Sequence, residues 1–291
     1  MEAGLLTPLH TSSAEAHALA RQARRDWDAA LSLISRHGPG RRGGALLDVL
    51  LIRAEFILSD TGAEFSEDSH GVGELRRITT EHGTRPLREG AVTAVHTANP
   101  QHIRKFMENA IGVCRDKSIE RITVAHKGNS IKYTDGLFAL TARKAMEELV
   151  TTPSVVCDSL IIDHMAAELV RNPDKYRAVL THSAFADLLA AVLDGQLAGD
   201  RGGVCTTLDT AGRPQFGYDT ALDTTRPAHG SGDTARVRRL RSTLLAGAEL
   251  AGHLGFDAAR VAIGSAVTAV EDEDTTWPAA ERAARHAVVR D

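Results

Sequence analysis

Polar side chains with catalytic potential follow three short apolar runs of the chain. Residues 126–129 (HKGN) come after one run, residues 181–183 (THS) come after a second, and Arg53 ends a third. If these runs are strands of an α/β protein, their carboxyl ends lie where ligands bind. A lysine and an arginine placed there suit proton transfer and the binding of acidic groups.

Two aspartates, Asp163 and Asp187, each stand near the start of an expected helix. Carboxylate oxygens are ligands that divalent cations prefer. Aspartate is also favoured at helix N-termini because it complements the helix dipole. Lys127 taken alone can likewise be an ordinary surface lysine. Residue types by themselves leave metal ligation and capping open.

The elements that must position these residues alternate between strand and helix, which predicts an α/β fold. We expect strands over 46–52, 122–125 and 177–181. We expect helices over 13–35, from Asn99-Pro100, from a Thr134 cap, over 161–171, through Leu193, and over 234–254 and 257–270. Loop or unpatterned sequence is expected over 37–44, 59–90 and 195–232.

Composition narrows the class of protein. The chain has 291 residues, 43% of them apolar, and a net charge of −4, which gives no reason to expect nucleic-acid binding. Three scattered cysteines do not form a disulfide or zinc pattern. The N-terminal residues lack a basic segment and a long apolar run, so we expect neither a signal peptide nor a membrane span, and we expect a cytoplasmic protein.

Residues 126–138 (HKGNSIKYTDGLF) resemble the K-x-N-x-x-K-x-T-D/E-G-x-F motif of the β-decarboxylating dehydrogenases, the isocitrate/isopropylmalate dehydrogenase family. Weaker matches follow in the family's order. They cover residues 23–28, 50–55, 161–173, 181–191, 229–231 and 242–255. The family's first strand and glycine-rich turn have no counterpart, so we expect a divergent, N-terminally shortened member.

The resemblance implies an isocitrate/isopropylmalate dehydrogenase-like two-domain fold with a reduced cofactor domain. Residues 31–190 are expected to form the small, dimerisation domain that carries most catalytic groups. Residues 1–30 and 191–291 are expected to form the reduced cofactor-binding domain. Because the family's sites are shared between subunits, the resemblance also implies a homodimer.

The implied reaction is NAD-linked, Mg²⁺- or Mn²⁺-dependent oxidative decarboxylation of a 3-substituted, malate-type 2-hydroxy acid. By position in the family's motifs, Lys127 and Asp163 are the expected catalytic residues, and Asp163 and Asp187 the expected metal ligands. The expected substrate-binding residues are Arg53, Arg24 and Asn129. Cofactor binding falls to His229, Gly230, Ser231 and Asp233, where an acidic residue favours NAD, although four nearby arginines keep NADP open.

The chain departs from the family's pattern in ways that support two alternatives. The family's tyrosine after R-E-N is missing, and Ala191 stands where the second aspartate of D-x-x-x-D is expected. His164 or His182 could compensate near a metal. One alternative is a non-redox decarboxylase on the same scaffold. The other is a non-catalytic subunit that pairs with a complete homologue.

Overall fold

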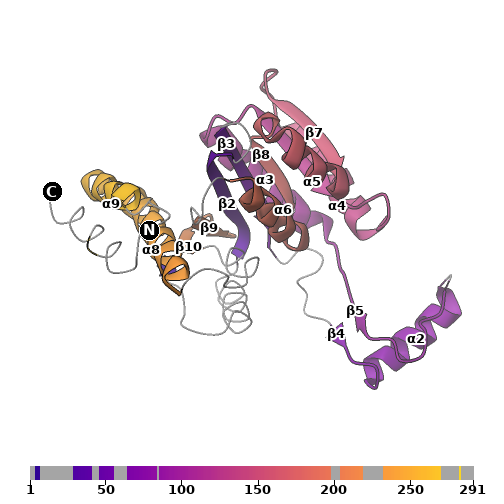
Figure 1. Ribbon diagram of the computed structural model, residues 1–291. Coiled ribbons are helices and arrows are strands. Elements are labelled where there is room, and N and C mark those ends of the chain that lie inside the picture. The colour runs from indigo at the N-terminus through magenta and orange to yellow at the C-terminus, as the bar shows by residue number, and fades with distance from the viewer. Residues whose placement is uncertain are drawn as a thin grey trace.

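The computed structural model describes residues 4–6, 29–40, 46–55, 64–83, 85–197, 204–218, 232–269 and Arg282. Within these residues, eight strands form one mixed sheet in the order β1-β10-β9-β2-β3-β8-β6-β7 (Figure 1). Their bounds are Gly4–Leu6 (β1), Ala29–Pro39 (β2), Leu46–Ala54 (β3), Arg121–His126 (β6), Val156–Ile161 (β7), Ala178–His182 (β8), Val204–Asp209 (β9) and Pro214–Tyr218 (β10). The expected α/β class is confirmed.

The four strands β3, β8, β6 and β7 run parallel to one another. Their register pairs Arg53 with Thr181, Val124 with Leu180, and His126 with Ile161. The carboxyl ends of all four strands therefore lie at one edge of the sheet, which we call the carboxyl edge. In folds of this kind that edge is where ligands bind.

Two helix layers cover this parallel part of the sheet. Helices α3 (Pro100–Asp116) and α4 (Thr134–Leu149) pack on one face through a core that includes Phe106, Phe138 and Leu180. Helices α5 (Ile162–Arg171) and α6 (Ser183–Gln196) pack on the other face. Strands buried on both faces need continuous apolar sequence, as the pattern of β6 and β8 shows. At the start of α3, the Asn99 Oδ1 accepts the N–H of Gln101, as the sequence predicted.

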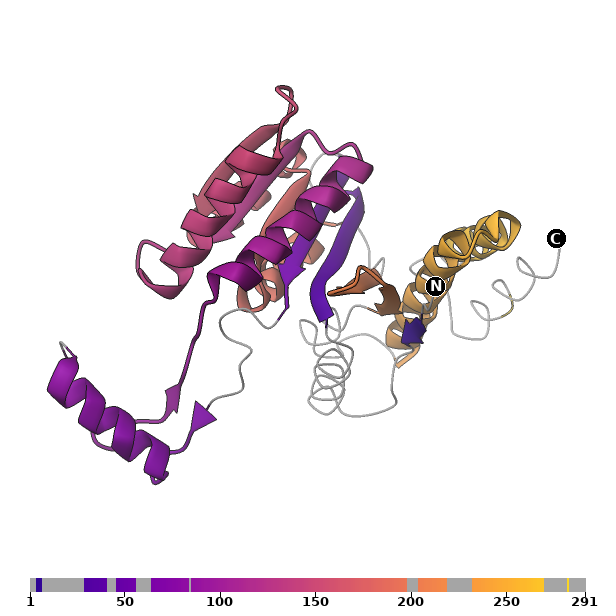
Figure 2. The same ribbon diagram turned by 180° about the vertical axis from the view of Figure 1, so that it is seen from behind.

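The remaining elements extend from both sides of this layered body. Helices α8 (Gly232–His253) and α9 (Asp257–Ala269) form a hairpin, and α8 packs beside β10, β9 and β1. On the other side, α2 (His70–His82) and the two-stranded sheet of β4 (Glu64–Phe65) and β5 (Thr93–Ala94) project as an arm (Figure 2). None of the helices that the structure describes is long and apolar enough to cross a bilayer.

The expected helix over 13–35 is wrong at its C-terminal end, and so is the loop expected from residue 37. Residues 29–39 form β2, which lies in the middle of the sheet between β3 and β9. Alanine and arginine upstream dominate the helical pattern, whereas L-S-L-I-S at 31–35 suits a pleated strand. Residues 13–28 lie outside the described part of the chain.

Four further differences from the sequence-based expectations are found. Residues 195–232, expected to be irregular, contain the hairpin of β9 and β10, whose turn places Gly212 at φ 78°. Strand β7 was not predicted, because its polar half resembles a loop. The unpatterned stretch 59–90 contains α2, and the residue before α4 is Tyr133, with Thr134 inside the helix rather than capping it.

A buried ion pair connects β2 to α6. The Arg36 side chain is fully buried, and its Nε lies 2.5 Å from the Asp194 Oδ1. Removing one partner of a buried ion pair leaves the other charge unpaired in the protein interior, which solvates it poorly. Replacing both partners with apolar side chains removes that penalty.

We therefore expect Arg36→Ala to lower the free energy of unfolding by about 3–5 kcal/mol. The double variant Arg36→Met/Asp194→Leu should recover most of that loss, because no buried charge then remains. Urea titration followed by circular dichroism measures both variants. Arg77→Ala, which removes an exposed arginine of α2, is the control and should leave stability unchanged. A single variant as stable as the parent would contradict this account.

Candidate functional site at the carboxyl edge of the parallel strands

The Lys127–Asp163 ion pair lies at the carboxyl edge. Lys127 follows β6, Asp163 lies in the first turn of α5 directly after β7, and the Lys127 ammonium donates to the Asp163 Oδ2. These two strands are hydrogen-bonded neighbours, so the sheet itself brings the two side chains together. The Lys127 side chain is mostly buried and the Asp163 side chain is exposed, so the pair opens toward solvent.

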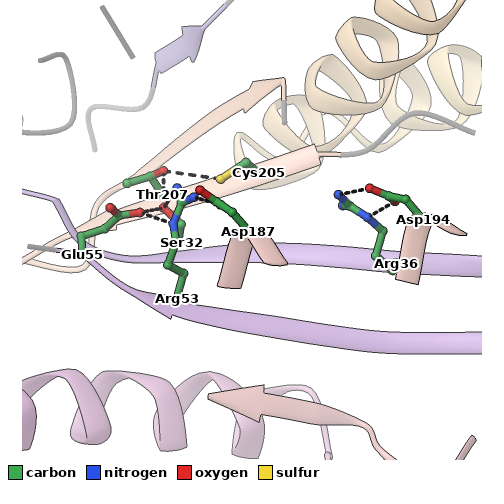
Figure 3. A network of polar contacts seen from close by, with 8 residues as sticks. All are labelled: Ser32, Arg36, Arg53, Glu55, Asp187, Asp194, Cys205 and Thr207. Atoms are coloured by element: carbon green, nitrogen blue, oxygen red, sulfur yellow. Dashed lines mark hydrogen bonds and ion pairs between the residues drawn. The ribbon is translucent and has the colours of Figure 1, made fainter. Parts of the chain in front are cut away.

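Arg53 is the centre of a second polar cluster, shown in Figure 3. Its Nε donates to the Glu55 Oε1 and its Nη1 to the Asp187 Oδ1, both at 2.8 Å. The Ser32 hydroxyl donates to the same Glu55 oxygen and lies 2.9 Å from the Thr207 hydroxyl. Arg53 and Glu55 are buried, whereas half of the Asp187 side chain is exposed. Arg53 is thus held by the buried Glu55, while its contact with Asp187 lies at the carboxyl edge.

A third cluster connects β8 to the turn after β6. The buried Asp135 carboxylate accepts the backbone N–H of Lys127 at 2.9 Å through Oδ1, and the His182 Nε2 lies 3.2 Å from the same oxygen. His182 ends β8 and is 3% exposed. In the same turn, the Gly128 N–H donates to the His126 Nδ1 at 3.0 Å. These contacts hold the turn after β6 beside the end of β8.

Burial and hydrogen bonding act in opposite directions on the acidic member of this cluster. Burial alone raises the pKa of Asp135, but hydrogen bonds from His182 and the Lys127 N–H outweigh it and hold the pKa below its usual value. Burial also lowers the pKa of His126, and the nearby Asp135 carboxylate only partly opposes this. A neutral His126 keeps Nδ1 free to accept the Gly128 N–H.

The structure brings four of the predicted site residues to the carboxyl edge as two pairs, Lys127 with Asp163 and Arg53 with Asp187. Asn129 is exposed on the turn after β6. Of the other predicted residues, Arg24, His229, Gly230 and Ser231 lie outside the described residues, as does the Asp233 side chain. The roles predicted for all of these residues stay predictions.

The two histidines considered as metal neighbours differ in position. His164 is exposed beside Asp163. His182 is buried against Asp135, and the Phe138 ring lies edge-on to it at 5.9 Å between centroids. His182 therefore faces the interior and does not reach the open edge.

The donor set does not match the divalent ion that the family resemblance predicts. Across the described ranges, no three His, Cys, Asp or Glu side chains gather as a metal site would require. Asp163 and Asp187 are each bound by a basic side chain of the same chain. One copy of these residues does not, by itself, fit a hard cation.

Sequence reasoning missed Ser32, Glu55 and Asp135 as members of the site. Asp135 belongs to the motif at 126–138, so its presence there was a signal that it faces Lys127. Glu55 follows Arg53 by two residues, which places both on the same face of an extended chain. Nothing in the sequence pointed to Ser32, because its strand was expected to be a helix.

Comparison with known proteins adds a family relationship to this geometry. The profile described as isocitrate/isopropylmalate dehydrogenase matches residues 69–277. A mitochondrial regulatory subunit of NAD isocitrate dehydrogenase from Dictyostelium discoideum is 25% identical over 191 residues, which are 65% of this chain and 50% of that protein. The homoisocitrate dehydrogenase of Methanocaldococcus jannaschii is 25% identical over 185 residues, 64% of this chain and 43% of that protein.

The fold is also found in solved structures. The isocitrate dehydrogenase of Methylococcus capsulatus superposes with a TM-score of 0.71 at 19% identity, covering 99% of this chain and 80% of that one. At this identity the superposition shows the fold alone. The chain spans about half the length of the Dictyostelium and Methanocaldococcus relatives.

The lowered pKa of His126 gives a stability prediction. The folded chain holds fewer protons at this site than the unfolded chain, so stability rises with pH in this window. The contribution is complete above the ordinary histidine pKa of 6.5 and is lost as the pH falls through the lower folded value. Replacing the imidazole with an amide, which does not titrate, removes this linkage.

We expect His126→Gln to lose less unfolding free energy than the parent between about pH 7 and pH 5. The exposed His102 on α3 provides the control, since His102→Gln should leave the slope of stability against pH unchanged. Chemical denaturation at each pH measures the slopes. Identical slopes for the parent and His126→Gln would show that burial does not hold His126 neutral.

Proposed function

The chain belongs to the isocitrate/isopropylmalate dehydrogenase family, and we propose that it catalyses NAD-linked oxidative decarboxylation of a malate-type 2-hydroxy acid. One observation carries the proposal. A lysine–aspartate pair and an arginine–aspartate pair lie at the ends of parallel strands of one sheet. In the proposal, the lysine of the first pair serves proton transfer and the arginine of the second binds a carboxylate.

In the proposed reaction, Lys127 as the neutral amine takes the proton of the substrate hydroxyl, and bound NAD would accept the hydride. After CO₂ has left, the Lys127 ammonium returns that proton to the enolate. Asp163 holds the lysine side chain in place through its ion pair. The residues expected to contact NAD are His229, Gly230, Ser231 and Asp233. A positioned acid or base of this kind contributes about 10²–10⁴-fold to a rate.

Arg53 binds a substrate carboxylate in this proposal. Its contact with Glu55 is buried and its contact with Asp187 is half exposed. An incoming carboxylate therefore replaces Asp187 rather than Glu55, because Asp187 is the more exposed of these two partners. The Arg53 Nη1 that donates to Asp187 would then donate to the substrate, while Nη2 stays near the Ser32 hydroxyl.

A divalent ion is the part of the proposal that one copy of the chain does not satisfy. Hard divalent cations take about six or more oxygen ligands, some of them water. The two aspartates are held by Lys127 and Arg53, and Ala191 supplies no carboxylate. We propose that a second copy completes the site in a homodimer, and the roles of Lys127 and Arg53 do not depend on the ion.

The same donor set favours a second candidate function, a non-catalytic subunit that pairs with a complete homologue. One relative is a protein named as a regulatory subunit of NAD isocitrate dehydrogenase. In this candidate, Lys127 and Asp163 are donated to a site whose remaining ligands come from the partner. The two candidates differ in whether the isolated chain turns over substrate.

The decisive experiment incubates the purified chain with NAD, Mn²⁺ and each of isocitrate, homoisocitrate and 3-isopropylmalate, and follows reduced nicotinamide by absorbance. We expect turnover of one substrate and a fall in kcat of about 10²-fold or more for Lys127→Ala. Lys144→Ala, at an exposed position on α4, is the matched control and should behave as the parent does.

The outcomes separate the candidates. Turnover that survives Lys127→Ala would refute the assigned role of the lysine. No turnover by the folded chain alone, with turnover restored when a complete homologous subunit is added, would establish the second candidate. No turnover under either condition would exclude dehydrogenase chemistry for this chain.

A further inference from the structure

The turn that carries Lys127 is held by more contacts than an ordinary surface turn. The Lys127 carbonyl accepts the N–H groups of Ser130 and Ile131, both at 3.0 Å. A Cβ added to Gly128 would lie 3.1 Å from the Gly136 Cα, so the turn lies directly against the start of α4. These contacts fix the shape of the turn and hold it against α4 and the end of β6.

Asp135 adds a further contact that holds the turn in this position. Its side chain is 1% exposed, and its Oδ1 accepts the Lys127 N–H. A carboxylate that accepts a backbone N–H forms a charge-assisted hydrogen bond, which is about twice as strong as a neutral one. The backbone of Lys127 is therefore tied to the first turn of α4 directly at the residue whose side chain reaches Asp163.

His182 supports the same oxygen from the neighbouring strand. Its register partner on β3 is Ala54, the residue after Arg53. The Phe185 ring centroid lies 4.3 Å from the His182 ring centroid, and Phe138 flanks the imidazole on another side. Within the described part of the chain, the buried His182 Nδ1 has no hydrogen-bond partner, so its contact with Asp135 orients the ring.

We propose that Asp135 and His182 are positioning residues for Lys127. They form a buried connection that runs from the end of β8, beside Arg53, to the backbone of the Lys127 turn. The connection sets the distance between the Lys127–Asp163 pair and the Arg53–Asp187 pair. The link to catalysis rests on the proposed function, whereas the anchoring of the turn does not.

The first measurement is hydrogen exchange at the Lys127 amide, which reads the Asp135 contact directly. Loss of a hydrogen bond to a charged group should accelerate local exchange roughly tenfold to hundredfold in Asp135→Ala. His182→Phe should accelerate it less, because Asp135 then remains but loses its support. His182→Gln, whose amide N–H can occupy the place of Nε2, should restore slow exchange. Asp135→Asn provides a milder variant if alanine prevents folding.

The second measurement separates positioning from general stability. In His182→Phe we expect kcat to fall roughly tenfold with little change in KM, and His182→Gln to recover it. Asp158→Asn is the matched control, because Asp158 forms an ion pair with Arg121 near the opposite ends of β6 and β7. This variant should lose global stability yet retain the local exchange rate at Lys127 and the parental kcat.

The outcomes separate three questions: whether Asp135 anchors the turn, whether stability alone explains the loss of kcat, and whether the proposed function holds. Unchanged exchange at Lys127 in folded Asp135→Ala or Asp135→Asn overturns the proposal. Accelerated exchange with an equal loss of kcat in Asp158→Asn also overturns it, because stability alone then explains the loss. Accelerated exchange in a chain that turns over no substrate supports the anchoring and refutes the proposed function.

Discussion

The parallel register of β3, β8, β6 and β7 is the constraint on which the candidate site depends. The register brings the polar residues that follow these strands to one edge, and burial of β3, β6 and β8 between two helix layers holds that register in place. The core of α3 and α4 on one side and of α5 and α6 on the other provides that burial. Residues more than a hundred positions apart, such as Arg53 and Asp187, thereby come into contact.

At the carboxyl edge, the basic and acidic side chains neutralise one another in ion pairs. Among the described residues, Arg53 pairs with a buried and a half-exposed carboxylate, and Lys127 pairs with an exposed one. Buried charges are tolerated only when they are paired, so Glu55 is needed to keep the guanidinium at a position that is almost closed to solvent. The exposed carboxylates of Asp163 and Asp187 are replaceable, because water solvates each of them once its partner is taken.

The motif at 126–138 allowed the sequence to predict the site better than the fold around it. Lys127 could be singled out because it follows an expected strand and lies in that motif, whereas Asp163 came from the weaker match at 161–173. Their contact depends on the register of β6 with β7, a strand that was not predicted. Strands β2 and β9 were not predicted, and the short alternating pattern of β2 was outweighed by the helical pattern upstream of it. Their identity depends on pairing with each other and with β3, which no short window of sequence contains. Ser32 was missed for the same reason.

If Arg53 binds a substrate carboxylate as proposed, its contacts also connect substrate binding to the Asp187 carboxylate. Its Nε donates to the buried Glu55, and its Nη1 donates to Asp187, whose side chain is half exposed. A substrate carboxylate that binds Nη1 releases Asp187, and the released carboxylate lies next to the ligand that displaced it. Arginine occupancy and the availability of Asp187 are therefore linked.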